Sequence, residues 1–560
     1  MAERHAITGK KLFWIASILV VLLLAIQILA STQVTQYNAN DLGLLSRLPI
    51  TFWVGLSYLC VLLYFGRKSG LRTIIVAVLI SFYLFGIPTL MSENKAEFLG
   101  ISYWFSSQGI QLLSAGHLSF GNLYPLNLLN WPGFFILAGF ISASTGLKVT
   151  LFADYFPLLT MALLGVLAYK TLRLQLNTLL SSFGALWFIA SFWTGQNYFS
   201  PQGIAYVIYF AIFLLLAKLF FTKKQNVKFP LTVFIFILIL ILFIGLVSTH
   251  LLTSFALAIG VIAVYALCKV FPQKRKIATF YSITTCILLV SVFFAYQALV
   301  ITQSFSGIAE LLYSQFSRGD THLAVISQGR AVQSPALLLS IFGSYSITII
   351  AVVIAVIAIL TTALGILLYK KEEAKNDLFW IAWIIVAGII GVCVFYGGEA
   401  IERAFILMLL PICYFAAKFF SKKPRILVFV LIIIVFLQIP ALYGSENYSY
   451  VPTSELKGVA FYTIYAPSTA PFFYEADLAS FGSRVTGIQL GVFTGASSLP
   501  SSELVNEKIG KANFIISSNE QRNFYQYFYG ANLLENLSLD DYYNRVYDNG
   551  GFQIYARLSQ

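Results

Sequence analysis

The stretch WPGFFILAGFISAST, residues 131–145, decides the architecture that we predict for this chain. It is apolar, but it begins with Trp-Pro-Gly and ends in small hydroxyl residues. It is also shorter than the roughly 20 residues that a membrane-crossing helix needs. A short helix with an aromatic edge and a proline at its start suits the membrane interface or a re-entrant position better than a full crossing. We therefore predict that residues 131–145 do not span a membrane.

The other apolar segments are longer. The chain of 560 residues is 59% hydrophobic, and apolar runs of about 20 residues recur along it. Fourteen segments qualify: 12–30, 50–66, 71–90, 124–145, 150–169, 177–194, 201–222, 229–247, 250–270, 277–300, 336–369, 378–396, 400–420 and 425–443. We predict an α-helical polytopic membrane protein. We expect its first run to be a retained helix, because it lacks the small-residue cleavage site of a signal peptide.

The basic residues predict the orientation. The formal net charge of +13 comes from short clusters between apolar segments, such as Lys10-Lys11, Lys223-Lys224 and Lys422-Lys423. This positive-inside pattern explains the charge without nucleic acid, and it places the N-terminus in the cytoplasm and the tail after Tyr443 outside the plasma membrane. Opposite ends require an odd number of crossings. We therefore predict about 13 transmembrane helices and one long outside loop over residues 91–150.

We divide the chain into three parts. Residues 1–70 are a two-helix transmembrane addition, residues 71–443 are the transmembrane core, and residues 444–560 are polar, aromatic and free of apolar runs. In the third part, ELKGVAFY and SSELVNEKI predict helices, KANFIIS predicts a strand, and RVYDNGGFQIYARL predicts a hairpin with an Asn-Gly turn. We expect a small extracytoplasmic α/β domain that docks on the membrane part.

Ionisable residues at membrane depth are costly and usually functional, so those outside the cytoplasmic clusters are informative. Glu93 and Glu97 follow the segment 71–90 and lie four residues apart, so a helix there would place both carboxylates on one face. They suit a general base or a metal-binding pair. The alternative is a solvated loop with two surface acids.

The outside loop 193–206, WTGQNYFSPQGIAY, combines amides with aromatic rings. Trp193, Gln196, Asn197 and Gln202 are the side chains that sugars bind, through hydroxyl hydrogen bonds and contacts to a ring face. The alternative is an aromatic belt at the membrane interface, with Ser200-Pro201 as an ordinary helix start.

Three further places carry charge or a histidine on the outside. His250 sits at a helix junction, Arg318 lies in the long loop 301–335, and Glu402 and Arg403 precede a helix. Arginine and histidine suit phosphate contact, and a long cationic loop suits a lipid-linked phosphate. The alternatives are that His250 is a structural histidine, that the loop 301–335 is a linker, and that Glu402 and Arg403 form a structural ion pair. The chain has no Walker loop, HExxH or nucleophile elbow, which disfavours soluble nucleotide chemistry.

From about residue 71 to 440 the layout resembles the GT-C superfamily of membrane glycosyltransferases. The resemblance rests on the acidic loop with Glu93 and Glu97, on QLLSAGHLSFGNLYPLNLLNWPGFF, on the Gly-ended ISASTG, on FADYFPLL followed by the basic turn YKTLRLQL, and on the late Arg403 with Pro411. The chain departs from the family in its first acid pair. It also departs in the second outside loop, which carries Asn197 or Gln202 where an Asp is usual.

The resemblance implies inverting transfer of a sugar from a polyprenyl-phosphate-linked donor, at the outer membrane face. Glu97 would be the base, and Arg403, with Arg318 or His250, would stabilise the leaving phosphate. The sequence contains no motif for a particular cofactor or metal ion, so the cofactor is left unassigned, and a requirement for a divalent cation is compatible with the sequence. A flippase of lipid-linked sugars and a non-catalytic subunit with a partner in a membrane complex are the rival readings.

Overall fold

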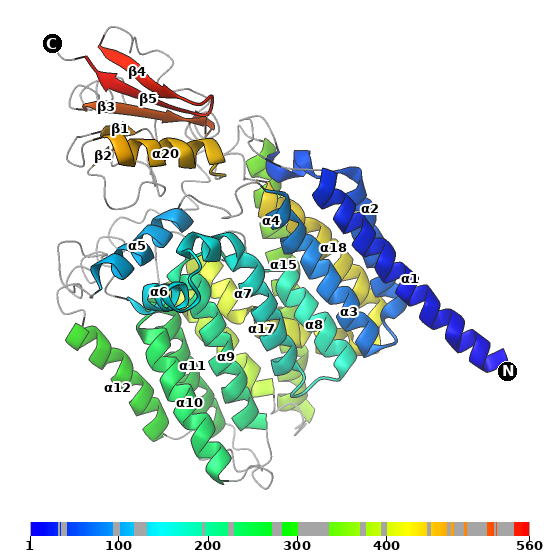
Figure 1. Cartoon of the computed structure of the whole chain (residues 1–560). Helices are drawn as coiled ribbons and strands as arrows, with labels where there is room; N and C mark the ends of the chain where they lie inside the picture. The colour runs from blue at the N-terminus through cyan, green and yellow to red at the C-terminus, as the bar shows by residue number, and fades with distance from the viewer. Residues whose placement is uncertain are drawn as a thin grey trace.

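The computed structural model describes most of the chain in separate stretches. They are residues 2–31, 34, 42–92, 101–116, 131–192, 197–221, 229–270, 283–300, 335–369, 377–393, 400–444, 450–466, 472–474, 487–489, 512–519, 522–523 and 542–558. Figure 1 shows a long bundle of helices with a small sheet domain at one end. The N-terminus lies at the end of the bundle farther from the sheet domain.

The bundle is built from α-helices with two short 3₁₀ turns. The helices are α1 (Ala2–Ser31), α2 (Ile50–Gly66), α3 (Gly70–Ser81), α4 (Ile87–Met91), α5 (Ile101–Ala115), α6 (Gly133–Thr145), α7 (Val149–Leu172), α8 (Thr178–Ala190), α9 (Pro201–Phe221), α10 (Phe229–Val247), α11 (Leu251–Val270), α12 (Ile283–Val300), α15 (Pro335–Tyr369), α16 (Leu378–Cys393), α17 (Ala400–Phe419) and α18 (Pro424–Tyr443). The turns are η1 (Gly43–Arg47) and η7 (Phe420–Lys422).

Each of the predicted apolar segments contains one of these helices. Within the described part, 7 helices are long and apolar enough to cross a membrane, and shorter apolar helices include α2, α6, α8, α10, α11, α12 and α16. Their outward faces are apolar as well, with Leu23 and Phe65 each more than half exposed. Exposed apolar side chains on so many helices are expected where lipid replaces water. The protein is a polytopic helical membrane protein, and the total of 13 crossings stays a prediction.

Helix α6 begins and ends at the same end of the bundle. Its C-terminus leads within three residues into α7, which runs from there to the basic turn at Arg173. At its N-terminus, the Gly133 N–H donates a 2.9 Å hydrogen bond to the Ser248 carbonyl, in the turn between α10 and α11. Both neighbours lie at the end of the bundle that faces the sheet domain (Figure 1). That residues 131–145 do not cross the membrane stays a prediction.

The helix that leads to Glu93 is interrupted by a π-helical turn. Residues Phe82–Gly86 form the π-helix η2 between α3 and α4, so residues 70–91 make one continuous rod. The Tyr443 hydroxyl, from α18, donates to the Leu84 carbonyl, and the Tyr83 hydroxyl donates to the Val21 carbonyl of α1 at 3.0 Å. Single π-turns inside α-helices often occur at functional sites. Here the turn is fixed between two neighbouring helices.

The N-terminal part is built into the core. Val34 forms an isolated parallel bridge with Ser92, in which the Val34 N–H donates to the Met91 carbonyl at 2.9 Å. The Tyr450 hydroxyl, from the linker to the sheet domain, donates to the Val34 carbonyl at 3.0 Å. Three segments far apart in sequence therefore meet at the residue that precedes Glu93.

The domain at the C-terminal end is mixed α/β, as predicted. Helix α20 (Thr453–Tyr465) packs on a five-stranded sheet of order β2-β1-β3-β5-β4, and β1 is parallel to both of its neighbours. The strands are β1 (Phe472–Tyr474), β2 (Gly487–Gln489), β3 (Phe514–Ser518), β4 (Tyr543–Asp548) and β5 (Phe552–Arg557). The helix predicted at SSELVNEKI lies outside the described residues.

The strand and the hairpin predicted in this domain are confirmed. KANFIIS contains most of β3, and β4 and β5 pair antiparallel around Asn549-Gly550-Gly551. Gly550 has φ +84°, and its N–H donates to the Asp548 carboxylate at 2.8 Å. That hydrogen bond lowers the pKa of Asp548, because it stabilises the charged form.

Candidate functional site

The two outside loops predicted to share a site meet in a cluster of aromatic rings. We call it the outer aromatic cluster, and its rings are Phe105 of α5, Phe134 of α6, Phe156 of α7, and Tyr198 and Phe199 from the second loop. The rings of Phe134 and Phe199 are 4.6 Å apart, and those of Phe105 and Tyr198 stack at 6.2 Å. Apolar packing thus holds the end of the second loop against the helices of the first.

The start of α9 has the predicted cap. The Ser200 hydroxyl accepts a 3.1 Å hydrogen bond from the Gly203 N–H, and Pro201 takes the first helical position. Gly203 allows a close approach, since a Cβ there would lie 2.6 Å from the Phe156 ring. One turn along, the Gln202 side-chain amide donates to the Tyr206 hydroxyl at 2.8 Å. Gln202 is buried, and this hydrogen bond fixes the orientation of its side chain.

Within the described part of this loop, Asn197 is a polar side chain without a hydrogen-bond partner. It is 2% exposed, and neither its amide nitrogen nor its amide oxygen has a hydrogen-bond partner among the residues that the structure describes. The indole N–H of Trp131, just before α6, and the Ser191 hydroxyl, at the end of α8, are buried and unpaired under the same restriction. An unsatisfied buried polar group costs about 1–3 kcal/mol, so such groups point to a ligand.

His250 caps α11. Its Nδ1 accepts from the Thr253 N–H at 3.3 Å and lies 2.8 Å from the Thr253 hydroxyl. Because Nδ1 accepts, the ring proton resides on Nε2 in this arrangement. Burial, and secondarily the charge of Arg403, hold the pKa of His250 well below its ordinary value. The ring is therefore neutral at physiological pH, which suits donation of a hydrogen bond from Nε2–H rather than transfer of a proton.

The residues of the GGEAIER stretch lie at the start of α17. Arg403 is buried, and its charge acts on His250 across the α11–α17 side of the site. Glu402 lies within electrostatic range of Tyr345 on α15. The charges of Arg403 and Glu402 thus act on groups of different segments, and the Glu402–Arg403 ion pair that the sequence suggested stays a prediction.

These places are connected by contacts. Asn197 adjoins Tyr198 and Phe199 in the outer aromatic cluster, Phe199 packs on Phe134 of α6, and α6 begins at Gly133, which bonds to Ser248. Ser248 lies two residues before His250, and the charge of Arg403 contributes to the lowered pKa of His250. Asn197, whose amide lacks a partner among the described residues, and the His250–Arg403 pair therefore lie in one layer of contacts around the start of α6.

Five predicted site residues lie outside the described residues: Glu93, Glu97, Trp193, Gln196 and Arg318. Ser92 and Asn197, which flank two of the stretches outside the description, are both buried. Among the described residues, no group of three His, Cys, Asp or Glu side chains could hold a metal ion. Carboxylate ligation by Glu93 and Glu97 stays a prediction.

Two residues of this layer escaped the sequence reasoning. Trp131 marked the edge of an interfacial helix, but its buried indole N–H faces no described acceptor. Glu455, in the first turn of α20, is 0% exposed, while its neighbours Val451 and Leu456 pack on the outer aromatic cluster. In sequence, Glu455 resembles an ordinary acid in the first turn of a helix. Its burial arises where the sheet domain docks.

The sequence comparisons and the structural comparison differ in outcome. No protein-family model matches the chain. No curated protein matches its sequence either. Among solved structures, it is similar to the Archaeoglobus fulgidus oligosaccharyltransferase tethered with an acceptor peptide that contains the NVT sequon, with a TM-score of 0.51 and 11% identity over 89% of this chain and 75% of that chain.

A second similar structure is the Archaeoglobus fulgidus oligosaccharyltransferase AglB in complex with an inhibitory peptide and a dolichol-phosphate. It has a TM-score of 0.50 and 11% identity, and covers 88% of this chain and 75% of that chain. The GT-C resemblance predicted from the layout is confirmed at the level of fold, with a divergent sequence. Likeness of fold leaves the chemistry to be argued from this chain's own residues.

Proposed function

We propose, from the GT-C fold as premise, that this membrane protein transfers a sugar from a polyprenyl-phosphate-linked donor to an acceptor at the outer face of the membrane. The observation that carries the proposal is the layer around the start of α6, which brings together the His250–Arg403 pair and the Asn197 amide that lacks a partner among the described residues. A similar fold was solved with a dolichol-phosphate, which is a polyprenyl-type lipid.

The groups of this layer suit the two halves of such a donor. An amide offers both a donor and an acceptor to sugar hydroxyls, and at Asn197 both are unused among the described residues. Arg403 supplies a fixed positive charge, and neutral His250 supplies an Nε2–H donor. A sugar beside Asn197 would satisfy an amide that lacks a partner among the described residues, and a phosphate beside Arg403 would meet a buried positive charge.

The proposed step is a single displacement. The acceptor oxygen attacks the anomeric carbon of the sugar and forms the new glycosidic bond, while the bond from that carbon to the phosphate oxygen breaks. The proton of the acceptor hydroxyl passes to the Glu97 carboxylate, and polyprenyl phosphate leaves with the electron pair of the broken bond. Attack from the opposite face inverts the anomeric configuration. Arg403 stabilises the charge that develops on the phosphate.

One observation sustains the non-catalytic alternative. The second outside loop carries amides at Asn197 and Gln202, where the resembling family usually carries an Asp, and Gln202 is held by Tyr206. An amide does not hold a metal ion as a carboxylate does. A protein without a base or a metal in this loop would keep the fold as a subunit of a membrane complex.

The test is transfer by the purified full-length protein in proteoliposomes. The donors are a panel of radiolabelled polyprenyl-phosphate hexoses and pentoses, and the readout is label that leaves the lipid phase, alone or with a membrane-extract acceptor. We expect Arg403→Met to lower transfer by about 10²–10³, the usual loss of a charge-stabilising group. Arg425→Met, which removes an exposed arginine in the first turn of α18, is the matched control.

The rival functions give different results. Label that crosses the bilayer and stays lipid-linked would indicate a flippase. A wild-type protein that transfers from no donor and co-purifies with a stoichiometric membrane partner would support the non-catalytic subunit. Either result overturns the proposal.

A further inference from the structure

The hydroxyl of Ser191, the residue that directly follows α8, is buried without a hydrogen-bond partner among the described residues. Ser191 is 2% exposed. Serine hydroxyls on helices often donate to a carbonyl one turn earlier. Ser182 of α8 does so, at 2.7 Å from the Thr178 carbonyl. The O–H of Ser191 instead calls for a group that the described part of the protein does not supply.

A second donor lies one turn earlier on the same side of α8. The side chain of Trp187 is fully buried, and its indole N–H has no partner among the described residues either. Residues four apart in a helix share one side. An indole N–H can only donate, and a hydroxyl can donate as well as accept. This side of α8 therefore suits a ligand that is rich in acceptors.

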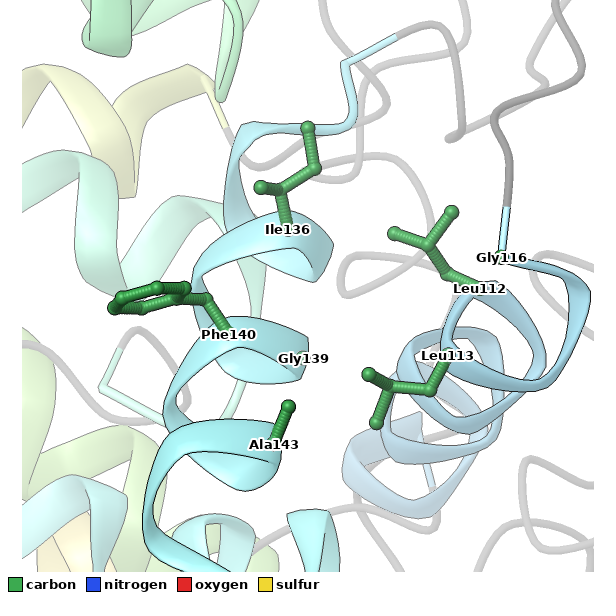
Figure 2. A pocket seen from close by; sticks show the side chains of 7 residues that line it. All are labelled: Leu112, Leu113, Gly116, Ile136, Gly139, Phe140 and Ala143. Carbon is green, nitrogen blue, oxygen red and sulfur yellow. The ribbon is translucent and has the colours of Figure 1, made fainter.

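Figure 2 shows an apolar pocket between α5 and α6 for comparison. It is lined by Leu112, Leu113, Gly116, Ile136, Gly139, Phe140 and Ala143. None of these side chains carries a charge or a hydrogen-bond donor. An anionic group would find no side-chain partner there, whereas the end of α8 presents donors.

Helix α17 packs against the side of α8 that carries Ser191. A Cβ at Gly184 would lie 3.6 Å from the Cys413 carbonyl oxygen and 3.8 Å from the Cβ of Ala417. Ser191 is seven residues beyond Gly184, about two turns, and so lies on the same side. On α17, Arg403 is fourteen residues before Ala417, about four turns, and again on the same side. Ser191 and Arg403 therefore lie on the facing sides of the two helices.

A second contact places Ser191 at the level of Arg403. The Gln438 side-chain amide, from α18, donates to the carbonyl of Phe192 at 2.7 Å. Helices α17 and α18 are joined by the short turn η7, so both arms of this hairpin can be measured from it. Arg403 lies ~25 Å before the turn and Gln438 ~24 Å after it. The residue next to Phe192 therefore reaches the end of the hairpin that carries Arg403.

The surroundings of Ser191 favour an anion. Between the levels of Arg403 and Cys413, the same side of α17 carries Ile406 and Leu410, which are buried and apolar. Arg403 is 8% exposed and brings a fixed positive charge. A phosphate offers oxygens that accept from a hydroxyl and a negative charge that meets the guanidinium. A sugar hydroxyl could satisfy Ser191, but it would bring no charge.

We propose that the Ser191 hydroxyl donates a hydrogen bond to the phosphate of the polyprenyl-phosphate donor, opposite Arg403. This inference rests on the proposed function and adds a phosphate-binding residue from the end of α8. The phosphate then lies between α8 and α17, and its oxygens take the hydrogen bond that no described group accepts.

The test measures binding of a fluorescent polyprenyl phosphate without sugar to the purified full-length protein in detergent micelles. The second probe is the corresponding polyprenol, which lacks the phosphate. We expect Ser191→Ala to lower the affinity for polyprenyl phosphate about 10- to 100-fold, the usual effect of losing a hydrogen bond to a charged group. The affinity for polyprenol should stay unchanged. The melting temperature should not fall, because alanine removes a hydroxyl without a described partner.

Ser182→Ala is the matched control. Ser182 is a serine of the same helix and is equally buried, but its hydroxyl is bonded to the Thr178 carbonyl. This variant should bind both probes like the wild type. Unlabelled polyprenyl phosphate should displace the probe, and phosphatidylglycerol and inorganic phosphate should not.

The contrary results are distinct. Wild-type affinity in Ser191→Ala would overturn the inference, and the proposed function would stand if Arg403→Met still lost transfer. An equal loss of affinity for polyprenol would assign Ser191 to the lipid chain and overturn the phosphate contact. Equal displacement by phosphatidylglycerol or inorganic phosphate would also overturn it, because the site would then accept any phosphate. A wild type that binds both probes equally would overturn both the inference and the phosphate role of Arg403.

Discussion

The backbone N–H of Gly133 donates a 2.9 Å hydrogen bond to the carbonyl of Ser248, and this contact joins the start of α6 to the turn before His250. It keeps the start of α6 against the segment that carries His250. The contact depends on a close approach, because a Cβ on Gly133 would lie 2.5 Å from the Thr249 hydroxyl and 2.7 Å from the Ser248 hydroxyl.

Gly133→Ala should therefore displace α6. The two hydroxyls cannot rotate away without loss, since both donate to the Gly245 carbonyl. We expect a destabilisation of about 1–3 kcal/mol, typical of overpacking, and a matching fall in transfer. Thermal unfolding of the purified protein measures the first. Gly245→Ala is the control, because a Cβ at that helical position meets nothing within 4 Å; equal melting temperatures for the two variants would contradict the contact.

The stability of the protein should fall with pH through His250. Its folded pKa lies below its ordinary value near 6.5, so the folded state binds fewer protons than the unfolded chain between the two values. The stabilising contribution is complete above the ordinary pKa and is lost as the pH falls toward the folded pKa. Protonation of Nδ1 would also remove the cap on the Thr253 N–H.

The measurement is the melting temperature at about pH 7 and about pH 5. His250→Asn preserves an N-cap acceptor without a titrating ring. We expect the drop in melting temperature on acidification to be smaller in His250→Asn than in the wild type. An equal drop in both proteins would show that His250 does not carry the pH dependence.

Asn197 offers a test that separates function from stability. Replacement by leucine removes two buried polar atoms that lack partners among the described residues, so the protein should be at least as stable as the wild type, by up to about 1–3 kcal/mol. Transfer should nevertheless be lost.

Asn177→Ala is the control with the opposite pattern, a loss of stability without a loss of transfer. Asn177 caps α8 by accepting a hydrogen bond from the Leu180 N–H at 2.9 Å. The substitution should cost about 1 kcal/mol of stability and leave transfer per folded molecule unchanged. An active Asn197→Leu variant would remove Asn197 from the sugar site.

The acid pair is tested by isosteric amides. Glu97→Gln should abolish transfer while expression and melting temperature stay at wild-type levels, because an amide cannot take the acceptor's proton. Glu93→Gln should reduce transfer less. Full activity in Glu97→Gln would exclude it as the base, and loss confined to Glu93→Gln would exchange the two roles.

Much of the fold was predictable because the membrane restricts the choices. Every apolar segment contains a helix, since a chain in lipid must satisfy its backbone hydrogen bonds internally. Caps and turns were equally predictable, because each depends on only a few neighbouring residues. Ser200-Pro201 formed the predicted helix start, and Asn549-Gly550 the predicted hairpin turn. Each of these signals acts over a few residues, so distant parts of the chain do not change it.

The site was less predictable because its groups come from distant segments. The sequence singled out Asn197, Gln202, His250 and Arg403 alike as polar candidates, but the structure gives them different surroundings. Gln202 bonds within its own helix, His250 is a neutral cap, and Asn197 alone lacks a described partner. Hydrogen-bond satisfaction depends on the whole neighbourhood of a side chain, which sequence spacing does not report.

The sequence by itself determined that this chain is a polytopic helical membrane protein with a small C-terminal α/β domain, because hydropathy and charge act locally and additively. The tertiary structure decided that Gly133, at the start of α6, lies against the turn at Ser248. It also decided that Glu455 is buried where the C-terminal domain docks. Both depend on packing between segments more than a hundred residues apart. Such contacts are fixed by shape and by the burial of the whole surface, not by any one stretch of residues.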